Sequence, residues 1–263
     1  MVKRLLVEPT EEYLRKHYSN VQTLSDFLEL FSMDVATWED DFMGDVIHGM
    51  YQASISGTGA TNFAIEAGTV NGIARLTSGT TDDGRSDFSL GLHFRGDQNC
   101  VMACRFQLSA VTTVKLEVGF TDVISGTDAG AVNVLTTPSF TATDCAVWCI
   151  DTDLDANYRG ASVANGVAAT NVAPGIGPVA ATYETLIVAL LGNTAADPDL
   201  CEAYYLRANA DGAITYRSSP QLLACRPTVL LTPWVFLQSR AVSASRNCDI
   251  DYLRVWQRRT ATL

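Results

Sequence analysis

Three aspartates alternate in the segment Asp151-Thr-Asp-Leu-Asp155, and alternate carboxylates can converge on a hard cation such as Ca²⁺. The segment lacks two features of an EF-hand loop, because Ala156 stands where the sixth position needs glycine and Ser162 stands where the twelfth needs glutamate. An EF-hand is therefore not expected. Asp151, Asp153 and Asp155 remain candidate ligands for Ca²⁺ in an irregular loop, and the favoured alternative is a solvated strand end and turn.

Cysteine and histidine could also provide metal ligands or a disulfide framework. An odd number of cysteines without a secretory signal favours free thiols. The pairs Cys100/Cys104 and Cys145/Cys149 would lie on one strand face with their sulfurs roughly 13 Å apart, too far for one bridge or one metal. The histidines show no ligand spacing. We predict small, buried, apolar thiols at all seven cysteines, which are Cys100, Cys104, Cys145, Cys149, Cys201, Cys225 and Cys248.

Other catalytic patterns are missing, and so are the marks of nucleic-acid or membrane binding. There is no Gly-x-Ser-x-Gly, phosphate loop or dinucleotide fingerprint. A net charge of −11 with few lysines argues against a nucleic-acid-binding surface. No apolar run of about 18 residues is present to span a membrane. The apolar stretch in residues 1–9 is too short for a signal peptide, so we expect synthesis in the cytoplasm.

The elements that must position any site are almost all strands. From Trp38 onward the chain consists of short β-type runs broken by Gly, Asn, Asp and Thr, which is typical of a sandwich or barrel. At 263 residues, one such domain with an extension is expected. Asn209-Ala-Asp-Gly212 predicts a hairpin turn between two strands. Residues 157–182 are rich in small residues and predict a long surface excursion, with an inter-subunit contact as one possible role.

The N-terminal segment has a different periodicity. Residues 10–32 read as helix in two pieces, with Thr10 as a cap. Apolar residues recur at helical spacing in the second piece, at Val21, Leu24, Phe27, Leu28 and Phe31. The sequence therefore predicts an arm with helices over residues 1–36 and a β-domain over residues 37–263.

The closing segment Cys248-Asp-Ile-Asp-Tyr-Leu-Arg-Val-Trp256 reads as a strand. Strict alternation predicts one face of Ile250, Tyr252, Arg254 and Trp256, and an opposite face of Asp249, Asp251, Leu253 and Val255. The run from Asp251 to Gln257 resembles the closing strand of concanavalin A-like sandwiches, the fold of laminin-G-type modules, legume lectins and family 16 glycoside hydrolases. Asp41-Phe-Met-Gly-Asp45 resembles the opening of that fold. The resemblance implies an all-β jelly-roll sandwich of two antiparallel sheets.

Family 16 hydrolases carry their catalytic carboxylates on one strand as Glu-x-Asp-x-x-Glu, a pattern that this sequence lacks. The strand most similar in location, Lys115 to Asp122, has Glu117 and Asp122. These two are five positions apart, so a regular strand would place them on opposite faces. We therefore expect no enzyme, and a hydrolase is the least favoured function.

Carbohydrate binding without catalysis is an alternative from another class. Trp38, Trp148, Trp234 and Trp256 could form a platform on which a sugar stacks, as in lectin-like modules. Most of them are instead expected to fill the core, because a sandwich needs large aromatic side chains between its layers.

The order of segments along the chain gives a second resemblance. Thr232-Pro-Trp-Val-Phe-Leu-Gln-Ser-Arg240 leads into the closing strand. Over residues 38–259 this order resembles virion proteins of tailed bacteriophages built on the concanavalin A-like sandwich. It implies a non-enzymatic capsid decoration, head-fibre or tail protein, assembled as a homo-oligomer in the host cytoplasm. The expected partner is the major capsid protein or another virion protein, contacted by Leu24, Phe27, Leu28 and Phe31 of the arm.

Overall fold

The computed structural model describes residues 35–69, 72–124, 130–192, 199–222 and 224–259. The described residues form strands and one short 3₁₀ helix, η1 (Gly96–Gln98). The first strands are β1 (Val35–Asp40), β2 (Gln52–Ser56), β3 (Thr61–Ile65), β4 (Ala74–Thr77), β5 (Arg85–Ser89), β6 (Val101–Leu108), β7 (Val114–Thr121), β8 (Val132–Val134) and β9 (Ser139–Phe140). The remaining strands are β10 (Cys145–Asp151), β11 (Asp155–Ala164), β12 (Val167–Ala168), β13 (Glu184–Leu191), β14 (Glu202–Ala208), β15 (Ile214–Arg217), β16 (Thr232–Ser239) and β17 (Asn247–Arg258).

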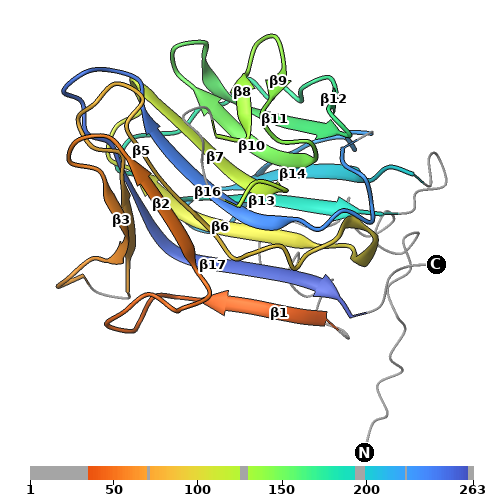
Figure 1. Ribbon diagram of the computed structural model, residues 1–263, viewed down its shortest axis with the longest axis horizontal. Coiled ribbons are helices and arrows are strands. Elements are labelled where there is room, and N and C mark those ends of the chain that lie inside the picture. Colours follow the sequence, from red (N-terminus) through yellow and green to blue (C-terminus); the bar gives the residue numbers. More distant parts are fainter. Residues whose placement is uncertain (1–34, 70–71, 125–129, 193–198, 223, 260–263) are drawn as a thin grey trace, which may run out of the picture.

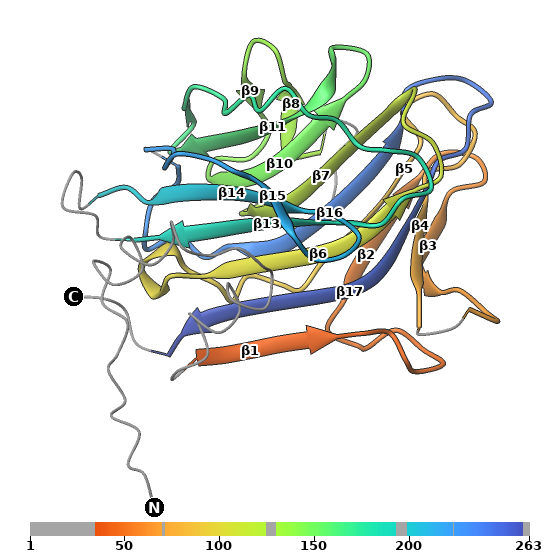
Figure 2. The ribbon, with the colours of Figure 1, turned by 180° about the vertical axis from the view of Figure 1, so that it is seen from behind.

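Two large antiparallel sheets face each other (Figure 1). One sheet has eight strands in the order β15-β14-β13-β6-β17-β4-β3, with β1 also paired to β17. The other has seven strands in the order β12-β11-β10-β7-β16-β5-β2. The predicted all-β jelly-roll sandwich is confirmed, and β1 and β17, from opposite ends of the described chain, lie side by side (Figure 2).

Apolar side chains from both sheets fill the space between them. The central strands contribute every second residue, as β-strand geometry requires. On β6 these are Met102, Cys104 and Phe106, and on β7 they include Leu116 and Val118. The core is therefore continuous between the two sheets.

Trp148 joins the two layers directly. Its ring lies in the core, and its indole Nε1 donates to the carbonyl oxygens of Ile187 on β13 (3.0 Å) and Leu206 on β14 (3.2 Å) in the opposite sheet. The ring also meets Tyr205 edge to face at 5.3 Å between centroids. A buried indole N–H needs such an acceptor. Trp148 therefore fills space in the core and also links the two sheets through hydrogen bonds.

The faces predicted for the closing strand are partly wrong. The pairing of β17 with β6 shifts register between Ile250 and Tyr252, as at a β-bulge. As a result Ile250, Leu253 and Val255 all enter the core, although strict alternation placed Ile250 on the opposite face from the other two. The bulge turns Trp256 to the outer face of the sheet.

The hairpin predicted at Asn209 to Gly212 is confirmed. β14 and β15 pair on either side of it, and Gly212 has a φ of 81°. The Asn209 side chain accepts hydrogen bonds from the backbone N–H groups of Asp211 and Ala213. A positive φ at the glycine is what the turn requires.

The prediction for residues 157–182 is wrong in its first part. Residues 157–164 belong to β11, which pairs with β10 from Cys145↔Val163 to Asp151↔Asp155, with a register shift between Cys149 and Asp151. Small residues such as Gly160 are needed there because a Cβ at that position would lie 2.6 Å from the Tyr205 ring. The composition that suggested a loop therefore reflects close packing of a strand against the core.

All seven cysteines are free and buried, as predicted. Burial raises the pKa of the Cys104 thiol above its ordinary range. In the part of the chain that the structure describes, no helix is long and apolar enough to cross a membrane. The helices predicted for residues 10–32 lie outside the described residues, and the last two residues of the predicted arm, 35 and 36, belong to β1.

Replacing Trp148 by Phe tests the link between the sheets. The change removes the donor for two buried carbonyl oxygens, so we expect the free energy of unfolding to fall by about 1–3 kcal/mol. Urea denaturation followed by circular dichroism measures it. Trp38→Phe is the matched control, because Trp38 is only partly buried and its Nε1 lies 3.4 Å from the Tyr51 hydroxyl. Equal losses in both variants would contradict the role of Trp148.

Candidate functional site

A cap covers one end of the outer face of the seven-stranded sheet. We call residues 130–142, which contain β8 and β9, the β8–β9 cap; these two strands lie beside β10 and β11 (Figure 1). The cap and the sheet share a second apolar cluster, separate from the core between the sheets. Its buried members are Ala131, Val132, Leu135 and Ala142 of the cap and Cys145, Val147, Cys149, Ala161, Val163, Trp234 and Phe236 of the sheet.

Two charged side chains of β7, Lys115 and Glu117, lie beneath the cap. Both are buried, and Lys115 Nζ is 3.2 Å from Glu117 Oε1. The Glu117 carboxylate accepts hydrogen bonds from the backbone N–H of Ala131 (2.8 Å) and Val132 (3.0 Å) and from Trp234 Nε1 (2.9 Å). Lys115 donates to the carbonyl oxygen of Val132. The pair therefore fastens the cap to the sheet.

The segment from Lys115 to Asp122 is the one that resembles the catalytic strand of the hydrolases in location. Its two acidic side chains, Glu117 and Asp122, are not free at the surface. Glu117 is fully enclosed, and a Cβ on Gly130 of the cap would lie 2.6 Å from its Oε1. Asp122 accepts hydrogen bonds from the backbone N–H of Thr143 (3.1 Å) and Asp144 (3.2 Å), and burial raises its pKa. Neither carboxylate is placed to flank a glycosidic bond, which needs two facing carboxyl groups.

The three candidate calcium ligands are placed at the turn between β10 and β11. Asp151 is buried and pairs with Arg240, and Asp155 pairs with Arg159 at 2.6 Å. Asp153 is exposed, with a pKa raised chiefly by desolvation. Two of the three carboxylates are thus neutralised by arginine. Among the described residues no group of three or more His, Cys, Asp or Glu could hold a metal ion. Calcium binding stays a prediction of the sequence.

The four tryptophans do not form a common platform. Trp148, Trp234 and Trp256 are buried. Trp148 lies between the sheets, as expected, whereas Trp234 and Trp256 belong to the apolar clusters on the outer faces of the two sheets. Trp38 on β1 is only partly buried, and its ring meets the His48 ring edge to face at 4.7 Å. It is therefore the one tryptophan that a ligand could reach.

Trp38 lines two hollows. We call the larger, of about 450 Å³, the Trp38 hollow; it is lined by Trp38, Glu39, Asp40, Phe42, Gly44, Val46, Ile47, His48, Gly49 and Ile65. The second, of about 370 Å³, is mostly apolar and is lined by Ala36, Thr37, Trp38, Met50, Leu90, His93, Phe94 and Gln257. The Trp38 hollow combines an aromatic ring, the carboxylate of Asp40 and an imidazole, groups that together can orient a polar ligand with an apolar face.

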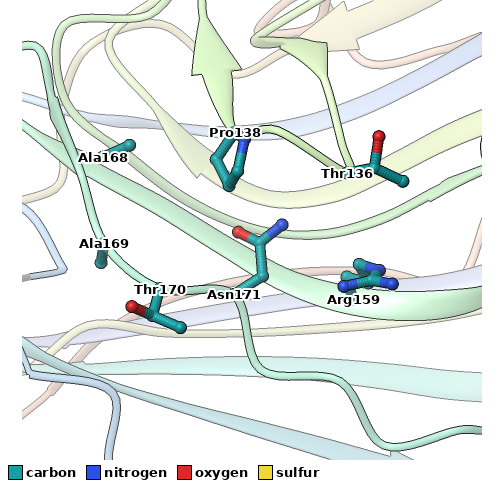
Figure 3. Close-up of a pocket in the computed structure, with 7 residues that line it drawn as sticks. All are labelled: Thr136, Pro138, Arg159, Ala168, Ala169, Thr170 and Asn171. Carbon is teal, nitrogen blue, oxygen red and sulfur yellow. The ribbon is translucent and has the colours of Figure 1, made fainter.

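A third hollow, of about 340 Å³, lies between the cap and the chain after β12 (Figure 3). Its lining residues are Thr136, Pro138, Arg159, Ala168, Ala169, Thr170 and Asn171. Arg159 is already paired with Asp155, and Asn171 Nδ2 donates to the carbonyl oxygen of Leu135 at 2.7 Å. No aromatic side chain lines it. This hollow therefore offers fewer groups to a ligand than the Trp38 hollow.

Sequence reasoning missed both the cap and the Trp38 hollow. Leu24, Phe27, Leu28 and Phe31, predicted to contact a partner, lie outside the described residues. The signal for the cap was weak, because its apolar residues are spread over a short polar segment. Trp38 was predicted as one of four candidates for sugar stacking, whereas Asp40 was given no role, although a carboxylate near a partly buried aromatic residue could have marked a binding site.

Comparisons with known proteins support the fold. No protein-family model and no curated protein matches the sequence. Among solved structures, the chain is similar to peanut lectin in complex with a nine-residue peptide, with 10% identity, a TM-score of 0.56 and coverage of 87% of this chain and 99% of the lectin. At such low identity the similarity shows the concanavalin A-like fold alone.

Two further similar structures differ in what they do. One is the CBM2 module of the evolved Dit of Lactobacillus casei BL23 phage J-1, with 9% identity, a TM-score of 0.52 and coverage of 88% of this chain and 99% of the module. The other is an endo-β-1,4-glucuronan lyase from the fungus Trichoderma reesei, with 10% identity, a TM-score of 0.51 and coverage of 84% and 94%. Because lectins and an enzyme share this fold, the fold does not decide between binding and catalysis.

Glu117→Gln tests whether the carboxylate fastens the cap. The change removes the negative charge beside buried Lys115, so the free energy of unfolding should fall by about 3–5 kcal/mol. Chemical denaturation measures the loss. Glu39→Gln is the control, because Glu39 is exposed and 3.7 Å from Arg254; it should change stability by less than about 0.5 kcal/mol. A stable Glu117→Gln protein would rule out this role.

Proposed function

We propose that the chain is a non-enzymatic structural protein of a tailed-bacteriophage virion, a capsid decoration or head-fibre protein present in several copies. The observation that carries the proposal is the use of Glu117. In a hydrolase of this fold a carboxylate on this strand would face substrate, whereas Glu117 accepts three hydrogen bonds from the cap and Trp234 and pairs with Lys115. A carboxylate used to close the sheet surface favours a scaffold.

Two further points support this proposal. The order of segments over residues 38–259 resembles that of phage virion proteins, and a module from a phage protein shares the fold. The chain also carries a net charge of −11, which suits a surface turned away from packaged DNA. The expected partner is the major capsid protein or another virion protein, and the expected location is the assembled particle.

Particles of the phage that encodes this chain provide the test. Purified virions should contain the chain in multiple copies by quantitative mass spectrometry, and electron microscopy should reveal density that is lost when its gene is disrupted. A disruption that leaves a neighbouring gene intact, complemented by the wild-type chain, is the control. If purified particles lack the chain while infected cells contain it, the virion proposal is wrong.

A second candidate function is recognition of a glycan at the Trp38 hollow. Trp38 presents an apolar ring beside Asp40 and His48, and a carboxylate makes strong hydrogen bonds to hydroxyl groups. Asp40 is held in place because its Oδ1 accepts the backbone N–H of Phe42 at 2.9 Å. A pyranose has the matching chemistry, with one apolar face and hydroxyls at its rim. Such a role is compatible with a place in the virion.

Trp38→Ala tests glycan recognition. If a glycan array identifies a ligand for the wild-type chain, Trp38→Ala should weaken its binding at least about tenfold, because a stacked aromatic residue is a typical hot spot. Isothermal titration calorimetry measures the affinity. Tyr183→Ala is the control, since it removes another partly buried aromatic ring, outside the Trp38 hollow. Unchanged affinity in Trp38→Ala would exclude this site.

A further inference from the structure

The outer face of the eight-stranded sheet carries two neighbouring rows of apolar side chains. The register of β14, β13, β6 and β17 aligns Tyr204, Ala189, Val101 and Trp256 in one row. In the next row it aligns Leu206, Ile187 and Ala103. We call these residues the apolar rows. They form one cluster, distinct from the core between the sheets.

The rest of the same face is polar. One row further along, Arg105 on β6 pairs with Asp251 on β17 at 3.2 Å. Beyond it, Arg75 on β4 pairs with Asp249 at 2.5 Å. Ion pairs of this kind are usual on a sheet face that meets solvent. The apolar rows are therefore a local exception, confined to the half of the face near Trp256.

The apolar rows are nevertheless buried. No side chain in them is more than 5% exposed, although all project away from the other sheet. Within the described part of the chain, the partly buried apolar residue that packs against them is Ile214 on β15. One side chain at the sheet edge cannot cover a face that extends over four strands, about 14 Å at the usual strand spacing. A further layer is required.

The path of the chain indicates which segment could supply that layer. β1 pairs with the end of β17, placing Val35 opposite Arg258 and Thr37 opposite Trp256. The chain before Val35 therefore leaves from the edge of the apolar rows. Four Cα steps separate Phe31 from Val35, and four extended steps reach at most about 14 Å. Phe31 consequently lies within about 14 Å of Val35, at the end of the sheet where the apolar rows lie.

We propose that residues 21–31 of the same chain cover the apolar rows, with Val21, Leu24, Phe27, Leu28 and Phe31 directed at the sheet. Two observations support this proposal. The segment carries an apolar stripe at helical spacing, which suits an apolar sheet face, and the segment is joined to the sheet at β1, close to that face. The short tether gives the segment a high effective concentration at the rows of its own chain. These side chains are then used inside the molecule and not to contact a capsid.

Photo-crosslinking tests the proposal on the full chain. Phe27 is replaced by p-benzoylphenylalanine, which keeps an aromatic side chain, and light and ¹⁵N-labelled chains are mixed before irradiation. We expect cross-links from position 27 to peptides that contain Ile187, Leu206 or Trp256. Both cross-linked peptides should carry the same isotope, because the contact is within one chain. The same probe at Gln22, on the polar side of the stripe, should give severalfold fewer. Mixed-isotope cross-links would assign the rows to a second copy, and an absence of sheet cross-links would also overturn the proposal.

A charge-insertion pair gives an independent measurement. Phe27→Asp should uncover the apolar rows and raise the fluorescence of a hydrophobic dye severalfold. Gln22→Asp adds the same charge to the polar side of the stripe and should leave the dye signal unchanged. Circular dichroism checks that the sandwich persists, and equal dye signals would contradict the proposal. Neither experiment depends on the virion role, so the failure of one proposal leaves the other standing.

Discussion

Each sheet of this sandwich buries apolar side chains on both of its faces, and this constraint shapes the rest of the molecule. A two-layer sandwich needs only its inner faces covered, with polar residues outside. Here Trp234 and Phe236 on the outer face of the seven-stranded sheet are fully buried, and so are Val101 and Ile187 on the outer face of the other. Both sheets therefore need extra layers, which must come from segments outside the sandwich strands.

The free-energy cost of adding such a layer depends on the polar groups that it buries. Covering the seven-stranded sheet encloses Lys115 and Glu117, and a buried charge is tolerated only when it is paired and hydrogen-bonded. The cap meets this requirement with the backbone N–H groups of Ala131 and Val132, and Trp234 adds its indole. The same contacts that satisfy the carboxylate therefore hold the cap in place, which makes Glu117 a structural residue.

The sequence allowed the fold to be predicted where local chemistry decides it. The turn at Gly212 and the buried thiols follow from residue type, and so does the burial of most tryptophans. The faces of β17 could not be predicted, because the shift after Ile250 arises from pairing with β6 and has no marker in the sequence. The partners of Glu117 were equally hidden, since Ala131 becomes its neighbour only when the cap folds onto β7.

The cap restricts where a ligand can bind on the seven-stranded sheet. It covers one end of the outer face of that sheet and encloses Glu117, so the loops and edges are the more accessible places for a ligand. The loop after β1 is such a place, because Val46 is 83% exposed and Met43 is 66% exposed beside the Trp38 hollow. Apolar side chains at a loop tip are costly in water unless something covers them, so this edge is where a surface partner or a glycan would add most to the stability of the complex.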